Sequence, residues 1–335
     1  MIKNNSFKEI WDKIKASKRI GMTLHYGPDG DSLASCTAMK YVIEKYLRKT
    51  VEIISEDNPG EGLISLWITK EIDFTKGITT VNPKDFDLFL IIDCASYNMI
   101  YGKEVEQSTV DRFFKNVFTI NIDHHLNNPH FCNMTYVDDK AQSTASILLE
   151  MFKSLKITFD KELSSRLILG ITTDSGFFTY GGGESSFGDA AFLIKHGAEY
   201  VDRIVNPLKN NTPLRIKQYH ALLIQNFRLK KIKDKNIGYS FITSNNLKKF
   251  RINHSELRQS TSTLAEVKEA YFVFMLTELA DQVRCAFRSR KGVDVSVFAR
   301  ALGGGGHKSA AACILPKIPL KEANNMVLSM LRKKL

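Results

Sequence analysis

The stretch Leu88-Phe-Leu-Ile-Ile92, followed directly by Asp93, decides the fold class that we predict for this chain. Five consecutive apolar residues that end at a charged one are typical of a strand covered on both faces, as in a parallel sheet. Other β-rich runs occur at 19–25, 51–55 and 116–122, and the apolar spacing of residues 32–48 is that of a helix. This alternation predicts an α/β domain with a mainly parallel sheet that helices cover.

The rest of the chain suggests a second domain. Two more helices are predicted at 142–156 and 162–173, and the segment 206–215, with two prolines and three asparagines, is typical of a linker. Past it we expect a hairpin around 234–235, a helix over 255–267, paired strands at 271–278 and 282–289, and two further helices. The chain is therefore predicted to have a catalytic domain at 1–206, a linker at 207–216 and a smaller α/β domain with a mixed sheet at 217–335.

The composition is that of a globular protein. Of 335 residues, 43% are hydrophobic and 25% are charged, which excludes a largely disordered, collagen-like or disulfide-dense chain. No apolar stretch approaches the roughly 20 residues of a membrane span, and the polar first residues contain no apolar signal core. The five cysteines form no C-x-x-C pair, which favours reduced thiols. We therefore expect a cytoplasmic protein without a membrane partner.

Charge is distributed unevenly along the chain. Residues 1–206 contain 23 Lys+Arg and 28 Asp+Glu, a net charge of −5, whereas residues 207–335 contain 24 and 8, a net charge of +16. An acidic first half indicates metal binding, and a basic second half indicates a negatively charged partner such as RNA or a nucleotide. A solvated basic surface is the alternative for the second half.

Polar clusters follow three of the predicted strands. His25-Tyr-Gly-Pro-Asp29-Gly-Asp31 comes after the first, Asp93 closes the third, and Asp123-His124-His125 follows the run that ends at Ile122. Loops at the carboxyl ends of neighbouring strands meet in one crevice, so we expect these clusters to converge. Asp29 and Asp31 alternate along a predicted extended turn, and they are therefore expected to point to different sides.

Asp174, after the apolar helical run at 167–171, completes a candidate set of metal ligands. The set contains His25, Asp29, Asp31, Asp93, His124 and Asp174. Imidazoles and carboxylates without a thiolate suit Mn²⁺, with Mg²⁺ or Co²⁺ as alternatives. Four carboxylates indicate two cations with a shared ligand, and Asp123 is expected to orient an imidazole from outside the ligand set. A polar turn at the protein surface is the alternative for each motif taken alone.

The predicted second domain contains two candidate phosphate-binding features. In Gly303-Gly-Gly-Gly-His307 the backbone N–H groups of Gly304, Gly305 and Gly306 are unshielded by side chains, and His307 adds a donor. Arg288 and Ser289 end a predicted strand, where a guanidinium suits bidentate contacts with phosphate. A flexible hinge is the alternative for the glycine run, and the basic run at 228–235 is interpreted as a charged hairpin surface.

The ordered motifs resemble those of a known family. His25-x-x-x-Asp29-x-Asp31, Asp93, Asp123-His-His125 and Asp174 resemble, in this order, the four motifs of the DHH phosphoesterase superfamily. The glycine run resembles the signature of the associated C-terminal domain, and the layout is similar to the bacterial nanoRNase and pAp phosphatase branch. The resemblance implies one manganese ion on His25, Asp29 and Asp93, and another on Asp31, Asp93, His124 and Asp174. It also implies that His125 and Arg288 face the substrate.

The function implied by the resemblance is hydrolysis of short oligoribonucleotides and of 3′-phosphoadenosine 5′-phosphate (pAp) by a hydroxide that two metals activate, with His125, Asp93 and Asp123 as catalytic residues. One alternative is a phosphodiesterase of cyclic or linear dinucleotides such as c-di-AMP, pApA or pGpG. A second is an RNA- or nucleotide-binding protein without catalysis. Short RNA and small nucleotides are the expected partners, and a homodimer is left open.

Overall fold

The computed structural model describes residues 4–55, 57–101, 105–126, 128–179, 183–252, 254–289 and 292–335. The chain divides into two compact units, Met1–Asn211 and Thr212–Leu335. The helix η4 (Val201–Asn210) ends the first unit and α8 (Leu214–Gln225) begins the second. Of the predicted linker at 207–216, therefore, only residues 211–213 lie between helices.

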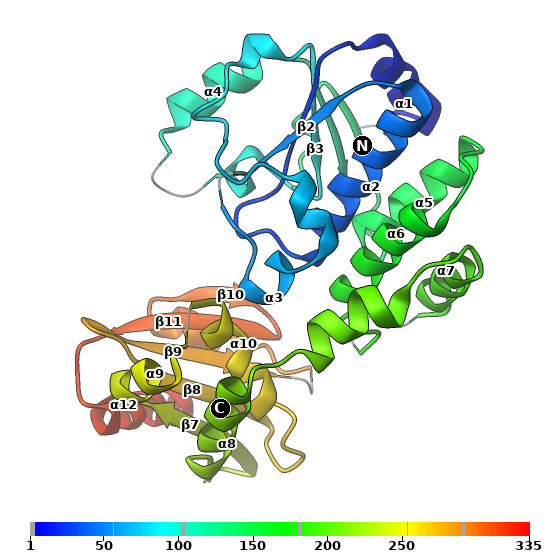
Figure 1. Cartoon of the computed structure of the whole chain (residues 1–335). Coiled ribbons are helices and arrows are strands. Elements are labelled where there is room, and N and C mark those ends of the chain that lie inside the picture. The colour runs from blue at the N-terminus through cyan, green and yellow to red at the C-terminus, as the bar shows by residue number, and fades with distance from the viewer. Residues whose placement is uncertain are drawn as a thin grey trace. The chain divides into compact units, whose positions relative to one another are not determined.

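The described strands of the first unit form a five-stranded parallel sheet in the order β2-β1-β3-β4-β5. The strands are β1 (Ile20–Thr23), β2 (Val51–Ile54), β3 (Leu88–Ile92), β4 (Thr119–Asp123) and β5 (Met134–Val137). The helices of this unit are labelled in Figure 1: α1 (Phe7–Ala16), α2 (Gly30–Leu47), α3 (Glu61–Ile64), α4 (Gln107–Lys115), α5 (Thr144–Ser154), α6 (Lys161–Asp174) and α7 (Glu184–Lys195). Three short 3₁₀ segments complete this unit: η1 (Trp67–Glu71), η2 (Pro83–Asp85) and η3 (Tyr97–Met99). The predicted parallel α/β sheet is confirmed.

Strand β3 shows why its sequence is continuously apolar. Every residue of β3 is buried. Leu88, Leu90 and Ile92 belong to the core shared with α1, α2, α5 and α6, whereas Phe89 and Ile91 belong to a second core shared with α4. Because successive side chains of a strand point to opposite faces, a strand covered on both faces needs an apolar residue at every position.

The second unit contains a six-stranded mixed sheet, as predicted, in the order β10-β11-β9-β8-β7-β6. Its strands are β6 (Arg228–Ile232), β7 (Lys235–Ile242), β8 (Phe272–Glu278), β9 (Gln282–Arg288), β10 (Gly305–His307) and β11 (Ala310–Pro316). Only the β7–β8 pair is parallel among these described strands. The helices after α8 are α9 (Ser244–Phe250), α10 (His254–Leu264), α11 (Ser296–Ala301) and α12 (Leu320–Lys334).

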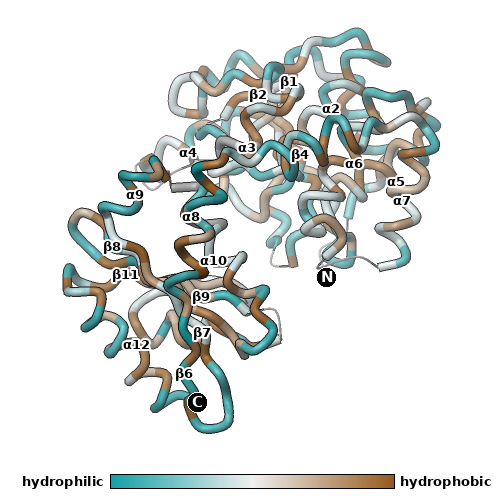
Figure 2. The backbone as a smooth tube through the Cα atoms, turned by 60° about the horizontal axis from the view of Figure 1, so that its bottom comes forward, coloured by the Kyte–Doolittle hydropathy of each residue, from teal (hydrophilic) through white to brown (hydrophobic). Residues whose placement is uncertain are grey.

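The basic run at 228–235 forms the predicted hairpin, β6 and β7, which is hydrophilic at its turn in Figure 2. The first four residues of β6 are exposed and only Ile232 is buried. β6 is an edge strand, and exposed lysines on an edge discourage pairing with other chains. No helix among the described residues is long and apolar enough to cross a lipid bilayer.

Glycines bring α2 and α6 close together beneath the polar clusters. A Cβ on Gly170 would lie 2.5 Å from Asp31 Oδ1 and 2.6 Å from Ala145 Cβ, and a Cβ on Gly30 would lie 2.3 Å from Thr173 Oγ1. Side chains do not approach so closely, so either glycine can be replaced only if a helix moves. The spacing between α2 and α6 therefore sets the position of Asp31.

We expect Gly170→Ala to destabilise the fold by about 1–3 kcal/mol, because the added methyl group overpacks the contact with Asp31 and Ala145. Gly188→Ala is the matched control, since Gly188 lies within α7 with open space around its Cα. Alanine is the better helix former, so this control should gain up to about 1 kcal/mol. Urea unfolding of both variants measures the difference, and equal stabilisation of the two would contradict the close approach of the helices.

Candidate metal centre

The predicted clusters lie at the carboxyl ends of three adjacent strands. In the sheet β1 lies beside β3, and β3 lies beside β4. His25 follows β1, Asp93 follows β3 directly, and Asp123 is the last residue of β4, with His124 and His125 after it. The order of the strands, rather than the order of the sequence, makes these three loops neighbours.

The start of α2 supplies two carboxylates in a way that differs from the sequence prediction. Asp29 and Asp31 do not alternate along an extended turn, because α2 begins at Gly30. Asp29 is its N-cap, with Oδ1 accepting hydrogen bonds from the backbone N–H groups of Asp31 and Ser32, both at 3.0 Å. Asp31 lies in the first helical turn and is buried. Asp29 at this position is explained by helix capping, because an Asp side chain at the N-cap accepts hydrogen bonds from the free N–H groups of the first turn.

The structure brings all six predicted ligands together, in three groups whose ligand atoms lie within 4.8 Å of one another. The groups are His25–Asp29–Asp93, Asp31–His124–Asp174 and Asp93–His124–His125. Asp93 and His124 each belong to two groups, so the groups form one continuous cluster. Asp29 and Asp31 belong to different groups, although the cause is the helix start rather than an extended turn.

Asp93 lies at the centre of this cluster. Its Oδ2 is 4.0 Å from His25 Nε2, and its Oδ1 is 3.6 Å from His124 Nε2 and accepts a hydrogen bond of 2.8 Å from Thr144 Oγ1. Its backbone has φ +63°, in the left-handed region, which aspartate tolerates better than most residues. Burial and the negative charge of Asp29 raise the pKa of Asp93 from 3.8 to about 7. His25, His125 and Thr144 therefore compensate the negative charge of this carboxylate only in part.

Asp31 is also buried, at the N-terminus of α5. Its Oδ2 accepts from the backbone N–H of Thr144 at 2.7 Å and its Oδ1 from that of Ala145 at 3.1 Å. The N–H groups at a helix N-terminus favour an anion. Even so, burial and the nearby charges of Asp93 and Asp174 raise the pKa of Asp31 well above its usual value.

The histidine and carboxylate on the His25 side favour their charged forms. Burial alone would lower the pKa of His25, but the hydrogen bond and charge of Asp29 raise it to about 9. The Asp29 side chain is 59% exposed, and its contacts with His25 and with the backbone amides lower the pKa of Asp29 to about 2. This pair supplies one imidazole and one ionised carboxylate beside Asp93.

The donor set fits two divalent cations. It consists of carboxylate oxygens and imidazole nitrogens without sulfur, which suits Mn²⁺ and related hard or borderline ions. The pKa values of Asp31, Asp93 and Asp174 are raised, because each carboxylate is partly or fully removed from solvent and lies near other carboxylates of the cluster. Buried like charges are unfavourable unless cations compensate them, so the cluster has the charge as well as the ligands of a two-metal site.

His125 differs from His25 and His124 in that its Nδ1 is paired with a carboxylate rather than with a backbone carbonyl oxygen. Its Nδ1–H donates to Asp123 Oδ1 at 2.7 Å, and this bond, against the opposing effect of burial, raises the pKa of His125 to about 9. Asp123 is fully buried, whereas the His125 side chain is 38% exposed. Nε2 of His125 is thus left for a ligand, as predicted for a residue that Asp123 orients.

Sequence reasoning missed three residues that support this site. Thr144 contacts both Asp31 and Asp93, and Asn121 and Asn128 lie in a buried network around Asp123. An asparagine at the centre of the apolar strand 119–122 is the one local signal that could have identified the network. Thr144 was recognisable only as part of a helix start.

In the second unit the predicted glycine loop is in part a strand. Residues 305–307 form β10, paired with β11. A Cβ on Gly304 would lie 2.2 Å from the carbonyl oxygen of Ala312, and a Cβ on Gly306, at φ +131°, would lie 2.6 Å from that of Ala310. Those two glycines are therefore required by packing between strands. Gly305 has open space around it.

Two other predicted substrate residues lie at the end of β9, which β11 separates from β10. Arg288 is the last residue of β9 and is paired with Ala310, and the backbone N–H of Ser289 donates to Ser309 O at 2.9 Å. Arg288, Ser289 and the glycines thus gather at one end of three adjacent strands. The backbone of His307 lies in β10, and its side chain is outside the described part of the structure.

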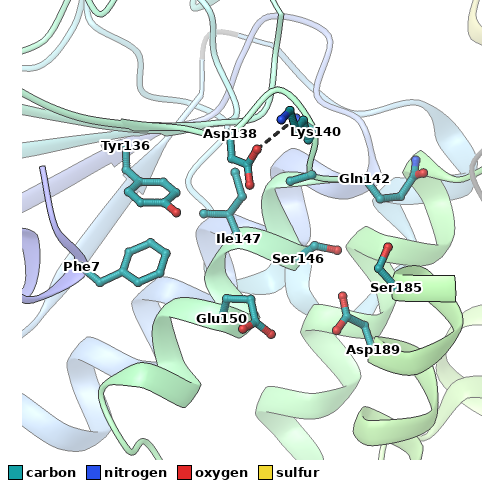
Figure 3. Close-up of a pocket in the computed structure, with 11 residues that line it drawn as sticks. Phe7, Tyr136, Asp138, Lys140, Gln142, Ser146, Ile147, Glu150, Ser185 and Asp189 are labelled. Atoms are coloured by element: carbon teal, nitrogen blue, oxygen red, sulfur yellow. Dashed lines mark hydrogen bonds between the residues drawn. The ribbon is translucent and has the colours of Figure 1, made fainter. Parts of the chain in front are cut away.

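A cavity of about 290 Å³ lies in the first unit on another side of α5 (Figure 3). Its polar lining includes the carboxylates of Asp138, Glu150 and Asp189. It adjoins the metal cluster at Ala141, whose carbonyl oxygen accepts a 3.4 Å hydrogen bond from His124 Nδ1. The sequence did not predict this cavity.

Comparison with known proteins supports the motif assignment. The model of the DHH family N-terminal domain matches residues 19–171, and that of the DHHA1 domain matches residues 234–334. The probable bifunctional oligoribonuclease and PAP phosphatase NrnA of Streptococcus mutans is 27% identical over 312 residues, which cover 91% of this chain and 92% of that protein. The cyclic-di-AMP phosphodiesterase GdpP of Bacillus subtilis is 26% identical over 341 residues, which cover 96% of this chain and 48% of that protein.

The fold has a close counterpart among solved structures. An exopolyphosphatase-related protein from Bacteroides fragilis has a TM-score of 0.86 at 20% identity, covering 98% of this chain and 95% of that chain. Both family models match in the order that the motifs predict, and the match with NrnA spans both units. The chain therefore has a DHH N-terminal domain, matched at residues 19–171, followed by a DHHA1 domain, matched at residues 234–334.

Proposed function

We propose that this chain is a manganese-dependent phosphoesterase that hydrolyses short oligoribonucleotides and pAp. The observation that carries the proposal is the continuous cluster of six ligands, in which Asp93 lies between the His25–Asp29 side and the His124 side. The relative named oligoribonuclease and PAP phosphatase supports this substrate class, since nearly the full length of both chains matches.

In this proposal His25, Asp29 and Asp93 hold one ion, and Asp31, Asp93, His124 and Asp174 hold the other. Two such ions supply Lewis acidity towards the phosphoryl oxygens and lower the pKa of water at the site. Thr144 and the N-terminus of α5 hold the carboxylates of Asp31 and Asp93 in place. His125, held by Asp123, directs Nε2–H towards a phosphate oxygen and stabilises the negative charge that develops there.

We assign substrate binding outside the metal centre to the basic second domain. Arg288 and Ser289 would contact a second phosphate or a terminal nucleotide, together with His307 and the backbone N–H groups of residues 304–306. The catalytic domain is assigned to 1–206 and the substrate domain to 217–335, joined at 207–216.

The test is a panel of end-labelled RNAs from 2 to 24 nucleotides, with pAp, pGpG and c-di-AMP, incubated with purified protein and Mn²⁺. We expect the highest kcat/KM on RNAs of two to five nucleotides and on pAp. Hydrolysis of c-di-AMP alone would instead support the alternative that the relative GdpP suggests. Tight RNA binding without turnover of any member of the panel would contradict an enzyme.

A further inference from the structure

Two asparagine side chains, the buried Asn121 and the half-buried Asn128, link the loop after β3 to the end of β4. Asn121 Nδ2 donates to Ile91 O at 2.9 Å and to Cys94 O at 3.1 Å. Asn128 Nδ2 lies 2.6 Å from Asp123 Oδ2, 2.7 Å from Asn121 Oδ1 and 3.3 Å from Cys94 O. These five contacts connect two strands that each carry part of the metal cluster.

On the β3 side, the network holds the turn that contains Asp93. Asp93 has the uncommon left-handed backbone conformation, and the carbonyl of the next residue, Cys94, accepts from both amides. An unusual backbone conformation persists where its surroundings restrict it, and two donors on one carbonyl provide that restriction.

On the β4 side, the network holds Asp123. One carboxylate oxygen of Asp123 accepts from His125 Nδ1 and the other accepts from Asn128 Nδ2. Asn128 Oδ1 in turn accepts from the backbone N–H of His130 at 2.9 Å. Without Asn128, Asp123 would keep only one of these two side-chain partners, and the direction of the His125 ring would be less defined.

We infer that Asn128, supported by Asn121, is a positioning residue that sets the His125 imidazole relative to Asp93. It touches neither the predicted substrate phosphate nor a predicted metal ligand with its side chain. It acts through the carboxylate of Asp123 and the carbonyl of Cys94. The kinetic part of this inference rests on the proposed function, whereas the spectroscopic part below does not.

The kinetic test compares Asn128→Ala with Asn133→Ala. Asn133 is the matched control because its Oδ1 accepts from Thr119 N at 2.8 Å and Thr119 Oγ1 at 3.0 Å, at the opposite end of the same strand β4. We expect Asn128→Ala to lower kcat on a diribonucleotide by about 10–100-fold, with little change in KM. Mutation of a residue that orients a ligand or catalytic side chain typically has an effect of this size. Asn133→Ala should keep wild-type kcat.

A double-mutant cycle tests whether Asn128 acts through Asp123. In an Asp123→Ala background, adding Asn128→Ala should lower kcat by less than it does in wild type, because the hydrogen bond to the Asp123 carboxylate is already gone and only the contact with Cys94 O remains to be lost. A full additive loss in the double variant would overturn the inference. So would unchanged kcat in Asn128→Ala.

The spectroscopic test uses metal-free protein with ¹⁵N-labelled histidine. A hydrogen-bonded Nδ1–H of His125, assigned by its absence in His125→Gln, should give a slowly exchanging downfield proton signal. We expect this signal in wild type and in Asn133→Ala, and its loss in Asn128→Ala. If Asn128→Ala retains it unchanged, the inference is wrong even if the enzyme is active. If wild type hydrolyses nothing, the proposed function fails and this signal alone decides the inference.

Discussion

Asp93→Asn is expected to lower hydrolysis of a diribonucleotide by about a thousandfold or more. Asp93 is the carboxylate that lies between the two sides of the metal cluster. Replacing it with the amide of asparagine would therefore weaken the binding of both proposed ions. A loss of about 4 kcal/mol of charge stabilisation in the transition state corresponds to that factor. Asparagine tolerates the left-handed backbone at this position, so the loss should come from the charge and not from the turn.

The matched control is Asp87→Asn. Asp87 precedes the same strand at its opposite end, and its Oδ1 accepts from Arg19 N at 2.9 Å and Lys18 N at 3.1 Å. Its replacement should cost about 1–2 kcal/mol of stability and leave kcat near wild type. Initial rates at saturating Mn²⁺ measure both variants. More than a tenth of wild-type activity in Asp93→Asn would reject the proposed centre.

Removal of metal is expected to abolish hydrolysis and to make stability fall as the pH rises. The pKa of Asp93 is about 7 in the folded chain against 3.8 ordinarily. The folded state therefore binds more protons than the unfolded state between these values, and stability decreases as the pH passes through this window. The pKa values of His25 and His125 are raised from 6.5 to about 9. Their stabilising contribution is complete below pH 6.5 and is lost as the pH approaches 9, which extends the decrease.

Urea unfolding of chelator-treated protein at pH 5, 6.5, 8 and 9 measures this dependence. Mn²⁺ at 100 times its dissociation constant should stabilise the protein by about 2.7 kcal/mol at pH 8 and restore hydrolysis. In Asp93→Asn the decrease between pH 5 and 7 should be smaller, because the titrating carboxyl is gone. A metal-free wild type with the same pH dependence as this variant would contradict the coupling between metal site and stability.

The positions of the strands were predictable because the signals are local. A run such as Leu88–Ile92 can be buried on both faces only as a central strand, and the structure has β3 at those residues. The β6–β7 hairpin and the β8–β9 pair were also predicted near their observed bounds. The strands β5, β10 and β11 and the helices α1, α7, α8 and α9 were not predicted, because their local patterns are weak and tertiary packing outweighs them.

At the glycine run the motif was recognised in the sequence, but the loop predicted for it differs from the strand observed there. Consecutive glycines predict an open loop, and Gly305 does have open space around it. Gly304 and Gly306 instead lie against the backbone of β11, where any side chain would collide with a carbonyl oxygen. That contact is invisible in the sequence, because nothing local to residues 303–307 identifies 310–312 as a neighbouring strand.

The sequence by itself determined the chemistry available to this protein: an α/β domain, polar clusters at its strand ends, and a set of carboxylates and imidazoles that suits divalent cations. These properties depend on residue type and on short-range spacing, both of which can be read from a short stretch of sequence. Only the tertiary structure decided how the atoms are arranged. The strand order makes β1, β3 and β4 neighbours, the close packing of α2 on α6 buries Asp31, and Asn128 reaches both Asp123 and Cys94. Such contacts join segments distant in the chain, and they form only when the burial of two apolar cores has aligned the elements that carry them.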